Sequence, residues 1–279
     1  MQLLRLLFVL AIFALLPTLI GHFALPNLPG ALIGLLIGLV IHIILLWWSP
    51  AIILKISGVY TYKKESYVSF HAVLTAICED MHIPVPRVAI TPSPQPNAFA
   101  VGRSSDDSTI VVTQGLLELV SEGESAAIVA QVLQYTQQQN FYITTITACY
   151  AAIITRIAQM GQFSVLSTKQ EERGNSLSAL LFFLLAPLAS TILKFILTER
   201  THLQADFEAA KVLKDPKYLA KSLEKVHLAV EHDIPLINPN PSLSALYVVH
   251  PIHQATLKAL FDTHPPMSTR LSRLLNMTL

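Results

Sequence analysis

The sequence predicts a mainly helical α+β membrane protein, with about four transmembrane helices and a soluble domain that contains a small β-sheet. Of its 279 residues, 52% are hydrophobic and only 13% are charged, whereas soluble domains carry about 25% charged residues. No Lys, Arg, Asp or Glu occurs between Arg5 and Lys55. The expected partner is therefore the lipid bilayer. A net charge of +1 gives no concentrated basic surface, so no nucleic acid is expected as a partner.

Two apolar stretches near the N-terminus are each long enough to cross a bilayer. Leu6 to Leu25 and Ala31 to Leu54 each supply about 20 apolar residues, and the sequence Pro-Asn-Leu-Pro-Gly between them is typical of a tight turn. We therefore predict a helical hairpin rather than a cleaved signal peptide, which would be followed by polar sequence. Basic residues flank both ends of this hairpin, so the positive-inside rule places the soluble domain in the cytoplasm.

His42 is a polar residue inside the second apolar stretch. Polar residues within a membrane span are functional candidates by default. A single His on an otherwise apolar helix is also explained by a hydrogen bond across the hairpin, and we favour that interpretation.

Hydrophobic periodicity and changes in polarity divide the chain into four parts. They are an N-terminal transmembrane hairpin (1–56), the first part of the soluble domain (57–140), a second transmembrane hairpin (141–198) and the second part of the soluble domain (199–279). The predicted helices are 65–81, 122–138, 199–213 and 216–230, the predicted strands are 87–91, 98–101 and 109–113, and the third and fourth spans are 141–157 and 177–196. A Pro/Asn-rich loop is predicted at 233–245.

Four short segments, taken in order, carry a family resemblance. They read PRVAI at 86–90, PNAFAVGR at 96–103, TIVVTQGLL at 109–117 and HPPMSTRL at 264–271. This set resembles the HtpX family of membrane zinc endopeptidases, which are relatives of the CaaX-processing peptidases. The resemblance covers nearly the whole chain. It implies a gluzincin-type metallopeptidase domain on the cytoplasmic side of a bacterial inner (plasma) membrane.

The residues that carry catalysis in this family are replaced. Active members have H-E-x-x-H on a helix, in which two His bind zinc and the Glu activates the metal-bound water. Counting from Glu124, the resemblance places Gln131, Val132 and Tyr135 at these positions. A neutral Gln amide is a poor zinc ligand, Tyr ionises only near pH 10, and Val cannot accept a proton.

The third ligand position of the family is also changed. Active members carry a Glu in a Glu-x-x-Ala-Asp motif, where this chain reads His202-Leu-Gln-Ala-Asp. We therefore expect no catalytic residue at the degenerate positions Gln131, Val132, Tyr135 and His202. No metal and no cofactor is expected there either, although zinc is the cofactor of active relatives.

Other family positions are retained. The resemblance implies that Asn97, Ala98 and Phe99 form an edge strand that pairs with an extended substrate. It also implies that His264 and Arg270 line the cleft near the carbonyl oxygen of the substrate. An equally weighted explanation is structural: Arg270 is a buried ion-pair partner and Asn97 forms a turn.

Three functions remain open from the sequence. The first is an inactive homologue (a pseudopeptidase) that binds unfolded or membrane-protein segments, or an active protease, in protein quality control. The second is an active membrane zinc endopeptidase with rearranged ligands around His202, in which His250 and His253 join His202 or His264. The third is a purely structural membrane subunit.

Overall fold

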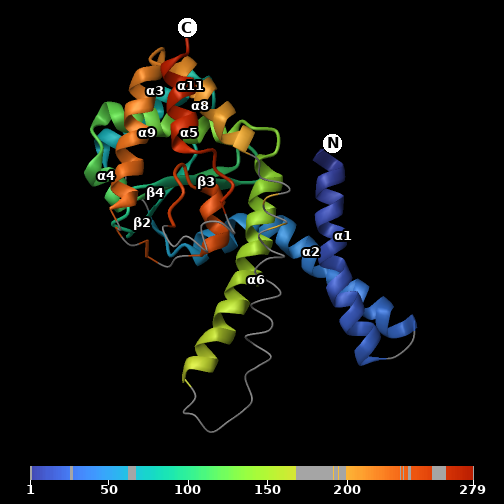
Figure 1. Ribbon diagram of the computed structural model, residues 1–279. Helices are drawn as coiled ribbons and strands as arrows, with labels where there is room; N and C mark the ends of the chain where they lie inside the picture. Colours follow the sequence, from blue (N-terminus) through green and yellow to red (C-terminus); the bar gives the residue numbers. More distant parts are fainter. Residues whose placement is uncertain are drawn as a thin grey trace.

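The computed structural model describes residues 2–25, 28–61, 67–167, 191, 194, 199–232, 234, 236–237, 240–252 and 262–278. Figure 1 shows a domain of helices around a small sheet, from which the N-terminal hairpin and one long helix, α6, extend. The predicted helix-rich α+β fold is confirmed.

The N-terminal hairpin consists of α1 (Gln2–Ala24) and α2 (Leu28–Ile56). Among the described residues, α2 is the one helix that is both long and apolar enough to cross a membrane, and only 28% of its most apolar window is buried. The core helix of a soluble protein would be mostly buried instead. Large side chains on its outer face, including Leu36, Ile43 and Trp47, are more than half exposed, as expected for a surface in contact with lipid.

Small residues let α1 and α2 approach closely. Gly30, Gly34 and Gly38 lie on the buried face of α2, and small residues at this spacing are typical of contacts between membrane helices. A Cβ atom added at Gly34 would lie 2.2 Å from the Pro17 carbonyl oxygen, whereas one at Gly38 would find its nearest neighbour at 3.5 Å.

This difference predicts unequal effects of two single-methyl substitutions. Gly34→Ala should separate the two helices and lower the thermal unfolding temperature of the detergent-purified protein. Gly38→Ala, the matched control, should leave that temperature nearly unchanged, because its methyl group meets ordinary van der Waals contacts. Equal effects of the two substitutions would contradict the close approach at Gly34.

His42 joins three helices. Its Nε2 lies 2.9 Å from the Leu10 carbonyl oxygen of α1, and its Nδ1 contacts the Tyr150 hydroxyl of α6 (Phe141–Ser167). The predicted hydrogen bond across the hairpin is confirmed, and it extends to α6.

The helix α6 covers the predicted third span and continues past its expected end at residue 157. It packs against α2, where the Tyr142 hydroxyl donates to the Leu46 carbonyl at 2.5 Å. Several Thr hydroxyls on α6 donate to carbonyls four residues earlier in the same helix, so these polar groups are satisfied internally. The predicted fourth span, 177–196, lies almost wholly outside the described residues, and four spans therefore remain a prediction.

The sheet has the order β1-β2-β4-β3. Its strands are β1 (Tyr60–Thr61), β2 (Arg87–Thr91), β3 (Ala98–Gly102) and β4 (Ser108–Thr113). β2 and β4 are parallel, and β3 is antiparallel to β4 at the edge of the sheet. The three predicted strands are confirmed, whereas the two-residue β1 was not predicted.

Both faces of β3 are covered, and successive side chains alternate between two cores. Ala98 and Ala100 belong to the core that contains α5, while Phe99 and Val101 belong to the core that contains α6. The sheet edge is therefore held between the helix that carries the degenerate motif and the long helix α6.

The remaining helices surround the sheet. They are α3 (Val68–Asp80), α4 (Gln114–Leu119), α5 (Glu122–Thr136), α8 (Glu199–Leu213), α9 (Pro216–Glu231), the 3₁₀ helix η2 (Pro241–Leu246) and α11 (Met267–Leu275). The four predicted soluble helices are confirmed to within three residues at each end. η2 begins within the predicted loop, because Asn240 caps a turn that Pro241 begins.

The start of α5 is fixed by a capping box, in which Ser121 and Glu124 satisfy each other's backbone amides. Glu124 also accepts a hydrogen bond from Lys225 of α9 at 2.6 Å. These contacts fix both the register and the position of the helix that carries Gln131, Val132 and Tyr135.

Candidate functional site

The four degenerate positions lie together in the structure. Gln131 and Tyr135 are four residues apart on α5 and share one face. His202, from the first turns of α8, faces them, and its ring centroid lies 5.3 Å from that of Tyr135. All four side chains, including Val132, are at most 3% exposed. The geometry therefore brings together the positions that the family resemblance assigns to zinc and its base.

This site is tightly packed. Within the described part of the chain, neither amide atom of Gln131 forms a hydrogen bond, and His202 faces Gln131 from α8. The gap that these side chains line with Phe99 and Tyr247 has no room for a water molecule. Each buried polar group left without a partner costs about 1–3 kcal/mol, so this cluster lowers the stability of the fold.

The residues present do not fit the zinc ion of active relatives. Burial raises the pKa of the Tyr135 phenol well above its usual value of 10, so the phenol stays protonated and does not ligate. Burial and the nearby Arg270 charge lower the pKa of His202 to about 3, which leaves a single neutral imidazole. Gln131 supplies only an amide, and Val132 supplies no base.

The edge strand β3 is already paired with the protein's own chain. The Val248 amide donates to the Ala98 carbonyl at 2.8 Å, and Phe99 forms an antiparallel bridge with Tyr247. We call residues 247–249 the covering segment. The sequence predicts a groove for a substrate strand at this edge, but the edge is not open, because the covering segment occupies it.

The retained polar residues hold the covering segment in place. The Asn97 side chain donates to the Val249 carbonyl at 2.7 Å and accepts from the Val249 amide at 3.2 Å. His264 Nε2 contacts the Tyr247 carbonyl oxygen at 2.7 Å, and Arg270 donates to the Val248 carbonyl at 2.6 Å. These three side chains thus bind backbone groups of the same chain.

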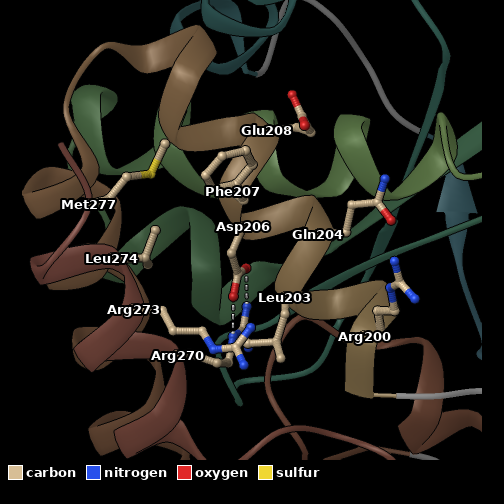
Figure 2. Close-up of a pocket in the computed structure, with 10 residues that line it drawn as sticks. All are labelled: Arg200, Leu203, Gln204, Asp206, Phe207, Glu208, Arg270, Arg273, Leu274 and Met277. Atoms are coloured by element: carbon tan, nitrogen blue, oxygen red, sulfur yellow. Dashed lines mark hydrogen bonds and ion pairs between the residues drawn. The ribbon is translucent and has the colours of Figure 1, made fainter. Parts of the chain in front are cut away.

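Arg270 also forms a buried ion pair with Asp206 of α8. Two hydrogen bonds, of 2.7 and 2.6 Å, join the guanidinium to the two carboxylate oxygens, and the side chains are only 1% and 3% exposed. Figure 2 shows this pair linking α8 and α11 beside a cavity of about 420 Å³. The structural explanation for Arg270 is confirmed, and its role toward a substrate remains a prediction.

Three histidines from separate parts of the sequence meet next to this ion pair. The rings of His202 and His264 stack with centroids 4.3 Å apart, and the His250 ring lies 5.4 Å from that of His264. His253 lies outside the described residues. Sequence reasoning missed Tyr247 and Asp262, because both occur where no periodic pattern or motif marks them.

The paired positions on α5, the facing position on α8 and the adjacent strand β3 have the arrangement that the resemblance to a metallopeptidase domain implies. The chain belongs to peptidase family M48, whose family model matches residues 66–278. The HtpX-type resemblance is therefore confirmed. Peptidases of this family depend on zinc.

Several relatives are similar over most of their length. Proteins named Protease HtpX homolog from Syntrophotalea carbinolica and Methanocaldococcus jannaschii are each 30% identical, over 253 and 251 residues, which cover 89% and 88% of both chains. The protein of that name from Pyrococcus furiosus is 31% identical over 248 residues, which cover 88% of this chain and 86% of the relative. No solved structure matches the chain.

Proposed function

We propose that this protein is a catalytically inactive, membrane-anchored member of family M48. The observation that carries the proposal is the packing of Gln131, Val132 and Tyr135 against His202 without a general base or a charged ligand. A general base alone contributes about 10²–10⁴-fold to rate, and the ligands that position the water are replaced as well. The test is chelator-sensitive hydrolysis of casein by the purified protein, with a variant that restores the family motif as its control.

The membrane anchor is the second part of the proposal. The exposed apolar surface of α2 is suited to contact with lipid. Trp47 and Trp48, exposed near the C-terminal end of this helix, are suited to the membrane interface. α6 packs on this hairpin. With the fourth span, this arrangement corresponds to about four membrane helices in a bacterial inner membrane, with the soluble domain in the cytoplasm.

We further propose that client polypeptides replace the covering segment on β3. The clients are unfolded or membrane-protein segments, or an active protease. The covering segment donates an amide to the Ala98 carbonyl and offers carbonyls to His264 and Arg270, and any extended chain with free amides and carbonyls carries the same groups. Binding by strand exchange requires no catalytic residue.

A photo-crosslinking residue at Phe99 tests this exchange. Azidophenylalanine adds an azide to a side chain that is fully buried, so the variant must first show an unchanged unfolding temperature. It should then crosslink to Tyr247 in the isolated protein, because the two rings lie 4.7 Å apart. We expect this internal product to fall and client adducts to appear when the cells contain misfolded membrane proteins. Internal product alone under both conditions would contradict strand exchange and favour a purely structural subunit.

The proximity of His202, His250 and His264 is the observation that favours the second function, an active peptidase with rearranged ligands. That function also requires a base near the bound water. Among the described residues, none of the side chains that line the gap beside Gln131 is a carboxylate. Casein hydrolysis by the unmodified protein would establish this alternative.

A further inference from the structure

A second group of metal-binding side chains lies near the degenerate site and consists of different residues. His250, Asp262 and His264 each offer one ligand atom, and these atoms lie within 4.8 Å of one another. Two imidazoles and a carboxylate form a donor set that zinc uses in proteins. Two atoms that are each about 2.1 Å from one ion are at most about 4.2 Å apart, so binding requires only a small contraction of the group.

The orientation of His264 is suited to a metal ligand. Its Nε2 lies 2.7 Å from the Tyr247 carbonyl oxygen, which can only accept, so the ring proton is on Nε2 and Nδ1 carries a lone pair. Nδ1 faces Asp262 Oδ1 at 3.9 Å, and the side chain is only 5% exposed. Within the described residues, Nδ1 has no hydrogen-bond partner. A ring N–H held by a backbone carbonyl is the usual arrangement behind a metal-binding His.

The other two ligands supply charge and access. The Asp262 side chain is 33% exposed and opens on a cavity of about 440 Å³, which His227 and Glu231 also line. The Ile252 amide donates to His250 Nδ1 at 3.3 Å, so this ring is neutral, as a metal ligand must be. An ion on Nδ1 would replace this long contact, and an ion on Nε2 would place the ring proton on Nδ1 and so break the contact as well.

We propose that His250, Asp262 and His264 bind one zinc ion at a site distinct from the family position on α5. The ion connects His250, which follows the covering segment, to Asp262 and His264, which precede α11. It therefore holds the covering segment over β3. From the sequence we expected no bound metal. The donor set that includes Asp262 revises that expectation. It is independent of the proposed inactivity, because it uses none of the degenerate positions Gln131, Val132, Tyr135 and His202.

Zinc titration of the detergent-purified full chain, after chelator treatment and dialysis, tests the site. We expect about one high-affinity zinc per chain by elemental mass spectrometry, and a higher thermal unfolding temperature when zinc is added. Asp262→Asn should weaken binding by about tenfold or more, while its amide oxygen can still accept from the His264 amide as Asp262 does at 3.0 Å. His250→Gln should weaken binding similarly.

Two control variants separate this site from its surroundings. His227→Gln changes the wall of the same cavity and should not alter zinc affinity. His202→Gln removes the ring that stacks on His264 but no ligand, so it should lower zinc affinity less than Asp262→Asn does. Absence of zinc from the native chain, or unchanged affinity in Asp262→Asn, overturns the site. Loss of binding in His202→Gln with normal binding in Asp262→Asn also overturns it.

Casein hydrolysis measured on the same samples distinguishes this proposal from the proposed inactivity. Zinc bound through Asp262 without hydrolysis supports both proposals. Hydrolysis that is lost in Asp262→Asn supports the site and overturns inactivity. No zinc and no hydrolysis overturns the site and supports inactivity.

Discussion

Replacing Arg270 with Ala is expected to destabilise the soluble domain by about 3–5 kcal/mol, because it leaves the Asp206 carboxylate buried without its partner. The side chain is 1% exposed, and it makes two hydrogen bonds to Asp206 and a third to the Val248 carbonyl. The same change should therefore loosen the covering segment. Thermal or denaturant unfolding of the detergent-purified protein measures the first effect, and protease sensitivity near residue 248 measures the second.

Arg273→Ala provides the matched control for this substitution. Arg273 lies one turn later on the same helix and is exposed, so its removal should change stability by less than about 0.5 kcal/mol. A loss below about 1 kcal/mol in Arg270→Ala would contradict the buried ion pair as a main support of the fold.

Restoring the family motif is expected to create a zinc peptidase. The variant that combines Gln131→His, Val132→Glu, Tyr135→His and His202→Glu places two imidazoles and a carboxylate around the present gap, with a base beside them. These positions already lie together, so no change of fold is needed. We expect one more zinc ion per chain than in the native protein, and chelator-sensitive hydrolysis of casein.

A variant with the three ligand changes but with Val132 retained separates binding from catalysis. It should bind the additional zinc and yet hydrolyse casein about 10²–10⁴-fold more slowly than the full variant, because the bound water has no base. If the full variant binds no additional zinc, the assignment of these positions from the resemblance is wrong.

Much of the fold follows from local patterns in the sequence. The length of the apolar stretch predicted α2, and the short apolar runs of β3 and β4, joined by a polar turn at 104–108, predicted two strands. The length of α6 did not follow, because the sequence becomes more polar after residue 157, with Gln159, Gln162 and Ser164, while the helix continues to Ser167. The short strand β1 is formed by pairing with β2 and has no local pattern of its own.

The site was predictable only where a motif marks it. The meeting of Gln131, Tyr135 and His202 followed from the resemblance, and helix geometry explains their common face. The covering segment did not follow, because its pairing with β3 depends on side chains about 150 residues away, such as Asn97. Asp262 is two residues from His264 in the sequence, but tertiary packing brings this pair to His250, so no sequence spacing indicates the three-residue group.

The degenerate positions are proposed to leave the protein without peptidase activity. Casein hydrolysis by the native, detergent-purified chain with and without a zinc chelator, measured beside the variant with the restored motif, tests this directly. We expect no chelator-sensitive cleavage by the native protein and clear cleavage by the restored variant. Cleavage by the native protein that a chelator abolishes would contradict it and would support an active peptidase with rearranged ligands.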